Sequence, residues 1–262
     1  MSTLQVALVG LGAVVAAFTL LWAVSVHLRD ASIADPSWGP GFLLVGGAYL
    51  WAHGEVTPRG VLAVAFVAAW ALRLGLHLLR RNRAHGEDAR YAAMRAAHGE
   101  RFRWLSLATV FWLQAVLLWI VSLPVLGAVV GSAPLGAWDA AGTAVFAAGF
   151  LTEAAADAQL TRFRSDPANR GKVLDRGLWR YSRHPNYFGD ALLWWGLWLV
   201  AVGAEAAWTV AGPALMTFLL VKVSGVTLLE RSLSKGRPEY ADYVRRTSAF
   251  VPWLPRDRRR RS

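Results

Sequence analysis

Residues Leu4–Val26 read LQVALVGLGAVVAAFTLLWAVSV and contain no charged side chain. A bilayer crossing by an α-helix needs about 20 predominantly apolar residues. The sequence therefore predicts that this stretch crosses a membrane. No Lys or Arg precedes the apolar run, and no small-residue cleavage site follows a short apolar core, so we do not interpret it as a removable signal peptide.

Further apolar segments of similar character follow along the chain. They are Pro40–Ala52, with Ile33 as an earlier start, Gly60–Leu79, Trp104–Val130, Trp138–Ala158, Gly189–Val202 and Ala206–Leu229. The pattern predicts an all-α membrane protein with about seven transmembrane helices in a single bundle, with counts of six or eight left open. Because there is no internal repeat and no low-complexity linker, we expect one domain over residues 1–262.

Composition and charge support a membrane location. Hydrophobic residues make up 55% of the 262 positions, which excludes disorder, and the absence of Cys excludes thiol catalysis. The net charge of +11 would suit a nucleic-acid partner, but 24 of the 28 Lys and Arg residues fall in three segments between apolar blocks, Arg80–Arg103, Gln159–His184 and Arg231–Ser262. We therefore expect the bilayer as partner and no nucleic acid. By the positive-inside rule the three segments are cytoplasmic, with the N-terminus outside and the C-terminus inside a bacterial inner membrane.

Ionisable residues inside apolar spans usually line a cavity or a pathway. Glu153 and Asp157 lie one helical turn apart, and Arg164 follows on the same side, so they form one stripe. Lys222 is a lone cation in the last span. A buried pair that only orients helices is the structural alternative for the stripe. The six His residues do not show metal-ligand spacing with carboxylates, so no metal site is expected.

Two further polar groups occur towards the N-terminus. Trp70, Arg73 and His77 follow helical spacing and would share one face, although Arg73 could simply extend its charge towards water. Asp35 precedes Pro36 at the start of the second span, where a carboxylate is often only a helix cap.

The most informative stretch is RGLWRYSRHPNYFGD, residues 176–190. Pro185 ends any helix begun before it and favours an extended His184, so Asn186 and Tyr187 are expected to open the next helix. The free N–H groups of a helix N-terminus favour anions such as phosphate, and the arginines of this stretch add donors. We predict a ligand-binding segment, with a basic connector on the membrane surface as the alternative.

At these residues the sequence resembles a known family. GLWRYSRHPNYFGD is similar to the C-terminal signature of the steroid 5-alpha-reductase superfamily. Most of the chain resembles the bacterial multi-pass membrane branch of that superfamily, formerly the domain of unknown function 1295 family, through ADPSWGPGF, GEDARYAAMR and SGVTLLERSLSKGRPEYADYVRRTSAFVPWLP. The resemblance implies a seven-helix bundle whose cytoplasmic loops and last helices bind NADPH. It also implies a hydrophobic small-molecule substrate, a lipidic enone, which receives a hydride at the carbon beta to its carbonyl.

The resemblance implies roles for individual residues. Asp157, Arg164 and Asn186 match family cofactor contacts, and Asp190 falls at the acidic end of the signature. The other residues expected at the cofactor are Lys172, Arg176, Arg180, Tyr181, His184, Tyr187, Lys222 and Glu230, three of them (Lys172, Arg176 and Arg180) by charge alone as phosphate partners. On the substrate side the expected catalytic residues are Asp35, Trp70 and Arg73, with Glu55 as a competitor for the carboxylate.

The chain departs from the family at one position. Steroid reductases place a Tyr beside the carboxylate to polarise the carbonyl, and the alignment puts Trp70 there. A Trp N–H can donate a hydrogen bond but not a proton. The only nearby phenol is Tyr91, in the basic loop, so either the donor comes from elsewhere or the reaction differs. A polyprenoid is therefore as plausible a substrate as a steroid.

Two other functions remain open. The RHPxYxG pattern also occurs in isoprenylcysteine carboxyl methyltransferases, which use S-adenosylmethionine, and Glu230, Tyr240 and Tyr243 echo their C-terminal ending. Those enzymes usually carry two adjacent Glu, whereas this chain has Leu229 before Glu230. The third possibility is a non-enzymatic membrane protein, which would not bind reduced nicotinamide.

Overall fold

The computed structural model describes residues 1–82, 87–223 and 238–256. All regular elements within these ranges are helices, with no β-strand, so the all-α class is confirmed for the described part of the chain. The chain divides into two compact units. Unit 1 comprises Met1–Asp139 and Trp198–Gly212, and unit 2 comprises Ala140–Leu197 and Pro213–Ser262. The single domain expected over residues 1–262 stays a prediction.

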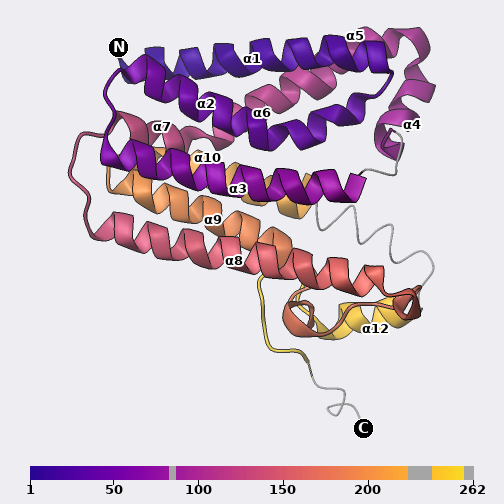
Figure 1. Cartoon of the computed structure of the whole chain (residues 1–262). Helices are drawn as coiled ribbons and strands as arrows, with labels where there is room; N and C mark the ends of the chain where they lie inside the picture. Colours follow the sequence, from indigo (N-terminus) through magenta and orange to yellow (C-terminus); the bar gives the residue numbers. More distant parts are fainter. Residues whose placement is uncertain (83–86, 224–237, 257–262) are drawn as a thin grey trace. The chain divides into compact units, whose positions relative to one another are not determined.

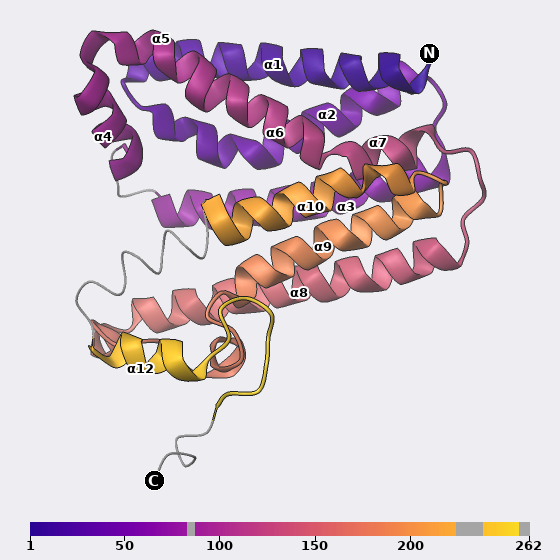
Figure 2. The ribbon, with the colours of Figure 1, turned by 180° about the vertical axis from the view of Figure 1, so that it is seen from behind.

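Unit 1 is built mainly from the N-terminal half of the chain. Its elements are α1 (Thr3–Leu28), η1 (Ala31–Ser37), α2 (Trp38–His53), α3 (Pro58–Asn82), α4 (Ala89–His98), η2 (Gly99–Arg101), α5 (Phe102–Ser106), η3 (Leu107–Trp112), α6 (Leu113–Val121), α7 (Leu123–Val130) and η6 (Ala207–Val210). In Figures 1 and 2, α1, α2 and α3 follow one another side by side.

Three helices of the described chain are long and apolar enough to cross a membrane. They are Thr3–Leu28, Pro58–Leu78 and the continuous helical run Ala89–Val121. The first begins at Ser2, whose hydroxyl accepts a hydrogen bond from the Gln5 N–H while the Gln5 side chain bonds the Ser2 N–H, a capping box. It ends where Arg29 adopts a left-handed conformation. A membrane-embedded protein is therefore supported, while the count of seven spans stays a prediction.

The span expected at Trp104–Val130 is not one continuous helix. Its first part contains a wide π turn, η3, and the helix ends at Ser122, after which α7 starts with Pro124 in its first turn. Pro124 has no N–H to continue the ladder of hydrogen bonds, which explains the break. The Ser122 hydroxyl donates to the Trp119 carbonyl at 2.7 Å and lies 2.8 Å from the Tyr49 hydroxyl. The polar group at the break is thus satisfied by a neighbouring helix.

The segment expected to form the last span, Ala206–Leu229, is also divided. It begins with the single turn η6, continues as α10 (Ala211–Phe218) and widens into the π turn η7 (Leu219–Val223). Residues from 224 to 229 lie outside the described residues.

A buried ion pair closes one end of unit 1. The Arg59 Nε donates to Asp139 Oδ1 at 2.7 Å and Nη2 donates to Oδ2 at 2.8 Å, a bidentate pair. The same guanidinium also donates to the carbonyls of Ala133 and Pro134, each at 2.8 Å. Both charged side chains are buried. Arg59 therefore ties the start of α3 to the loop that precedes α8.

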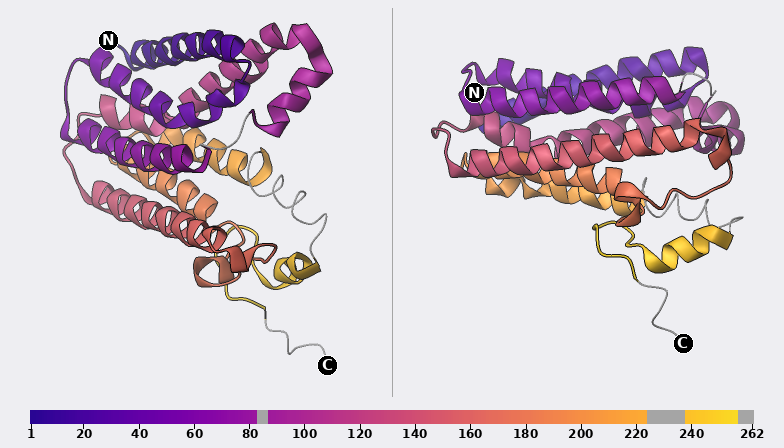
Figure 3. Two further views of the ribbon diagram at one scale, coloured as in Figure 1. Left: turned by 45° about the vertical axis from the view of Figure 1, so that its right-hand side comes forward. Right: turned by 60° about the horizontal axis from the view of Figure 1, so that its bottom comes forward.

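Unit 2 contains α8 (Ala137–Ser165) from Ala140 onwards, η4 (Pro167–Asn169), η5 (Gly177–Arg180), α9 (Pro185–Val202) up to Leu197, most of α10, η7 and α12 (Pro238–Arg246). Helices α8 and α9 lie side by side in all views, including both directions of Figure 3. Glycines allow this approach: a Cβ added to Gly149 would lie 2.5 Å from the Leu193 nitrogen, and one added to Gly189 would lie 2.5 Å from the Glu153 nitrogen. Such small-residue contacts are typical of membrane helix pairs.

Candidate active site

The carboxylate of Asp35 is the centre of a hydrogen-bonded network in unit 1. Asp35 lies in the short helix η1, just before α2. Its Oδ1 accepts a hydrogen bond from the Tyr91 hydroxyl at 2.7 Å, and its Oδ2 accepts one from Arg90 Nη2 at 2.8 Å. Both donors lie in the first turn of α4. The Asp35 side chain is 39% exposed, whereas Tyr91 is only 7% exposed, so a buried phenol meets a carboxylate that water can reach.

Gln114 and Trp38 extend this network into the core. Gln114 Nε2 donates to the Tyr91 hydroxyl at 3.2 Å and lies 3.5 Å from Asp35 Oδ1. Gln114 Oε1 accepts from the Trp38 indole N–H at 2.7 Å. Both ends of the amide therefore have partners that fix its orientation. The donors run in one direction, from Trp38 through Gln114 and Tyr91 to Asp35.

The position of α4 beside η1 has a separate cause. Glu87 Oε1 accepts a hydrogen bond from the Ala31 backbone N–H at 2.8 Å and another from Arg95 Nη2 at 2.7 Å, while Glu87 Oε2 accepts from Arg95 Nε at 3.0 Å. The hydrogen bonds from Arg95 lower the pKa of the Glu87 carboxyl, against the opposing effect of burial. Asp88 caps α4 by accepting from the Arg90 N–H. These contacts place Tyr91 opposite Asp35.

Trp70 and Arg73 of α3, the other residues expected on the substrate side, also lie in unit 1. Trp70 is buried, and its ring packs edge-on against Phe42 at 5.5 Å, which in turn packs against Trp38 at 5.8 Å. Trp70 thus belongs to the aromatic core beneath the network. The sequence alignment placed Trp70 beside the carboxylate, whereas the aromatic side chain bonded to Asp35 is Tyr91. A phenol can donate its proton, which an indole cannot.

Unit 2 brings together several of the residues expected at the cofactor. Asn186 Nδ2, in the first turn of α9, donates to Asp157 Oδ1 of α8 at 3.1 Å. The other amide atom, Asn186 Oδ1, is buried and has no hydrogen-bond partner among the described residues. The His184 ring stacks on Tyr187 with centroids 5.6 Å apart, and Asp190 is buried one turn further along α9.

Hydrogen bonds hold the buried side of the connector before α9 against α12. Arg183 Nη1 donates to the carbonyls of Val244 and Thr247 at 2.7 and 3.0 Å. The Tyr243 hydroxyl donates to the carbonyls of Trp179 and Ser182, and burial raises the pKa of this phenol. The connector and α12 are therefore clamped together. Tyr243, one of the residues by which the sequence resembles the methyltransferases, therefore holds the connector against α12.

The exposed side of the connector carries the cations. The exposed residues expected at the cofactor are Arg164, Lys172, Arg176, Arg180 and Tyr181. Arg176 lies 6.0 Å from the centre of the Phe163 ring, and both line a cavity of about 360 Å3 together with Arg162 and Asn169. Lys222 is also exposed, in η7, and Glu230 lies outside the described residues.

The comparison with known proteins covers both regions. A family model described as protein of unknown function (DUF1295) matches residues 21–247. The chain belongs to this family. A relative in Schizosaccharomyces pombe, "Uncharacterized protein C594.04c", is 26% identical over 273 residues, which covers 90% of this chain and 76% of that protein. No solved structure matches. The DUF1295 match includes both the Asp35–Tyr91 network and the Asp157–Asn186 pair.

Four residues of the network were missed as site residues by sequence reasoning: Trp38, Arg90, Tyr91 and Gln114. Tyr91 is separated from Asp35 by 56 positions and lies in a segment that reads as a basic loop. One signal was available in the DUF1295 chain, because Asp88 is a typical N-cap residue and the following ARYAAMRAAH predicts a short helix. That signal places Tyr91 on a helix but does not identify its partner.

Proposed function

We propose that this DUF1295 protein is a membrane oxidoreductase that transfers a hydride from NADPH to the C=C of an enone-type lipid, steroid-like or polyprenoid. The hydrogen bond between the Tyr91 hydroxyl and Asp35, 2.7 Å long, carries the proposal. Reduction of an enone needs a donor at the carbonyl oxygen, where negative charge develops as the hydride adds to the beta carbon. A buried phenol held by a hydrogen-bonded network meets this requirement. It supplies the proton donor that Trp70, at the aligned position, cannot provide.

Tyr91 can change its acceptor at little energetic cost. When a substrate carbonyl oxygen approaches, the Tyr91 hydroxyl turns from Asp35 Oδ1 to that oxygen. Asp35 keeps Arg90 on Oδ2, and Gln114 Nε2, 3.5 Å from Oδ1, is the nearest replacement donor. The carboxylate is therefore not left as an unpaired charge, which would be strongly unfavourable. As the hydride adds, Tyr91 gives its proton to that oxygen and an enol results. The enol then takes a proton from water at the alpha carbon while its oxygen returns a proton to Tyr91, so one hydride and one proton saturate the C=C.

Residues of unit 2 fit the cofactor in two respects. The buried Oδ1 of Asn186 would accept a hydrogen bond from an amide N–H of the ligand, and its Nδ2 is held by Asp157. The exposed cations Lys172, Arg176 and Arg180 suit phosphate groups. NADPH, when bound, supplies the hydride. We place the cations on the cytoplasmic side of a bacterial inner membrane, with the N-terminus outside, from the distribution of Lys and Arg.

The test uses the full chain purified in detergent, with NADPH, NADH and S-adenosylmethionine titrated separately while the melting temperature is followed. A ligand that binds only the native state raises the melting temperature with concentration. We expect NADPH to do so, and Asp157→Ala and Asn186→Ala to abolish the shift. Turnover is then measured by loss of NADPH absorbance with a steroid enone and a polyprenoid enone.

A pair of matched variants tests the donor. Tyr91→Phe removes one hydroxyl and should lower turnover about a hundredfold, the lower range for loss of a general acid, while the NADPH shift persists. Trp70→Phe keeps an aromatic ring in the core and should retain most turnover. The opposite ranking would reject Tyr91 as the donor. A shift with S-adenosylmethionine alone would favour methyl transfer, and no shift with any of the three ligands would favour a non-enzymatic protein.

A further inference from the structure

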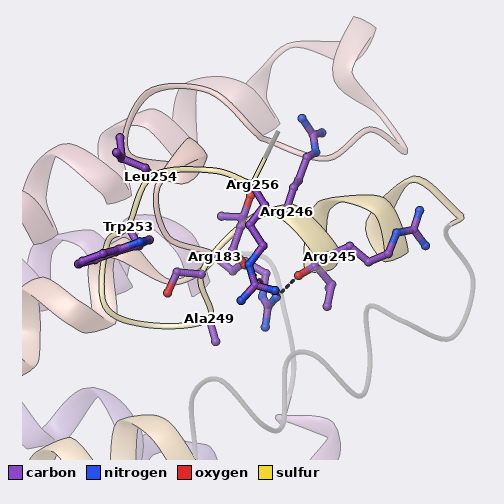
Figure 4. Close-up of a pocket in the computed structure, with 10 residues that line it drawn as sticks. Arg183, Arg245, Arg246, Ala249, Trp253, Leu254 and Arg256 are labelled. Atoms are coloured by element: carbon purple, nitrogen blue, oxygen red, sulfur yellow. Dashed lines mark hydrogen bonds between the residues drawn. The ribbon is translucent and has the colours of Figure 1, made fainter. Parts of the chain in front are cut away.

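A second cavity in unit 2, of about 410 Å3, has a strongly basic wall. It lies at the C-terminal end of α12 and is lined by Arg183, Arg245, Arg246 and Arg256, together with Thr247, Ser248, Trp253 and Leu254. None of these residues belongs to the proposed cofactor set. In Figure 4 the arginines gather on one side of Trp253 and Leu254.

The backbone of the cavity wall is held in place by hydrogen bonds. Arg183 is only 9% exposed, and besides its side-chain bonds its N–H donates to the Ser248 carbonyl at 2.8 Å. The Arg256 N–H donates to the Arg246 carbonyl at 2.9 Å and thereby closes the loop 247–255. The backbone N–H of Trp253 donates to the Tyr181 carbonyl at 3.0 Å. The loop therefore has a defined conformation before any ligand arrives.

The wall keeps a net positive charge. Asp242 pairs with Arg245 and Arg246 at 3.1 and 3.4 Å, and Asp175 pairs with Arg246 at 2.8 Å. These two carboxylates offset part of the charge of the four guanidinium groups. The Arg245 side chain is 71% exposed, so it can turn towards an anion. Arginine donors of this kind suit the oxygens of an anionic group, phosphate among them.

The rim of the cavity is apolar and exposed. Trp253 is 72% exposed and Leu254 is 76% exposed, and only Pro255 separates Leu254 from Arg256. A free phosphate ion would gain nothing from these side chains. Trp next to arginines is typical of the membrane–water interface, where apolar insertion and attraction to anionic lipids act together.

The start of α9 sets the expected depth of the cavity. Arg183 lies two residues before Pro185, the first residue of α9. A helix of 18 residues is about 27 Å long, close to the thickness of the hydrocarbon core. The sequence predicts a span at Gly189–Val202, within α9, and a crossing there would put Arg183 and the cavity beside it at the level of the lipid headgroups. Helix α9 is not among the three described helices that are long and apolar enough to cross a membrane.

We propose that this cavity binds the phosphate headgroup of an anionic phospholipid, with Trp253 and Leu254 among the apolar parts of the lipid. The proposal does not depend on hydride transfer. It assigns a function to a segment that lies partly beyond the family match, which ends at residue 247.

The experiment is native mass spectrometry of the full chain in detergent, titrated with phosphatidylglycerol or phosphatidylcholine of identical acyl chains. We expect retention of phosphatidylglycerol in preference to phosphatidylcholine. The double variant R245Q/R256Q should weaken phosphatidylglycerol binding roughly 25-fold, since each arginine near a membrane surface contributes about fivefold. The control R101Q/R170Q removes the same charge from exposed positions outside the cavity and should bind like the parent.

Two further measurements separate a lipid from a free anion. The variant W253S/L254S should weaken lipid binding while leaving all four arginines in place, and millimolar inorganic phosphate should not displace the lipid. Equal binding by R245Q/R256Q and R101Q/R170Q would overturn the proposal. So would displacement by inorganic phosphate together with unchanged binding by W253S/L254S, because the site would then take free anions.

Discussion

Unit 1 contains two aspartate–arginine networks, and they differ in burial. Asp139 and Arg59 are both buried, form a bidentate pair, and Arg59 also bonds two carbonyls. Asp35 and Arg90 are partly exposed, and the Asp35 carboxylate also accepts a hydrogen bond from the buried phenol of Tyr91. The same residue types therefore form a buried structural clamp at Arg59 and Asp139. At Asp35 they form a site that water can reach and that contains a proton donor, Tyr91.

This difference shows what distinguishes a site from a clamp. The clamp has no donor that could turn to a ligand without leaving a buried charge unpaired. In the network, Asp35 keeps Arg90 when Tyr91 turns away. Substitutions in the two regions should accordingly separate stability from activity.

The largest effect is expected at the clamp. Arg59→Met leaves the Asp139 carboxylate buried without its partner, so the free energy of unfolding should fall by about 3–5 kcal/mol. The measurement is unfolding of the detergent-solubilised protein by denaturant or heat. The double variant R59M/D139L removes both charges and should recover part of the loss. If R59M were no less stable than R90Q, the clamp would not have the role assigned to it.

A smaller effect, on activity, is expected from Asp35→Asn. This change keeps the side-chain shape but removes the charge that Tyr91 and Arg90 face, and turnover should fall about tenfold, or about 1.4 kcal/mol in the activation barrier. Because Asp35 is partly exposed, the melting temperature should change little. Asp139→Asn is the matched control and should do the reverse, lowering stability while the folded fraction keeps its turnover per molecule. Similar losses of turnover and stability in both variants would remove the distinction.

Arg90→Gln should have a still smaller effect on stability. Exposed ion pairs contribute about 0–1 kcal/mol, and high salt weakens them further. We expect the difference in unfolding free energy between R90Q and the parent to lie in this range and to shrink with added salt. A large, salt-independent loss would mean that Arg90 acts as a buried structural residue like Arg59.

The smallest effect concerns pH at the link between η1 and α4. The hydrogen bonds from Arg95 lower the pKa of Glu87 in the folded protein relative to an unfolded value of about 4.3. The stabilisation is therefore present above about pH 4.3 and is lost as the pH falls through the lower folded pKa. Melting temperatures between pH 6 and 3 should fall less steeply for Glu87→Gln than for the parent. Parallel curves would contradict this contribution.

The sequence predicted the parts of the fold that depend on local pattern. The apolar run at Leu4–Val26 became α1, because composition and the capping box at Ser2 both act over short distances. The break at Ser122 was missed, although Pro124 was visible, because a proline in the first turn of a new helix does not by itself show where the preceding helix ends.

The candidate site was only partly predictable for a similar reason. Asp35 was identified as a carboxylate at the start of a span, and Asp157 and Asn186, both assigned to the cofactor, are joined at 3.1 Å. The contact of Tyr91 with Asp35 was not predicted, because it depends on the hydrogen bonds by which Glu87 and Arg95 hold α4 against η1. Linear spacing contains no information about such a contact.

The indole of Trp38 determines the polarity of the whole network. Trp38 can donate but cannot accept, so Gln114 must present its oxygen to the indole and its nitrogen to Tyr91. Tyr91 is then obliged to point its own proton onward, and the last member, Asp35, must be an acceptor. One residue without any titratable group thus sets the direction in which the phenol faces. With a phenyl ring in place of the Trp38 indole, the Gln114 amide could rotate by half a turn. The side chains of the site would keep their places, but the direction of its hydrogen bonds would no longer be fixed.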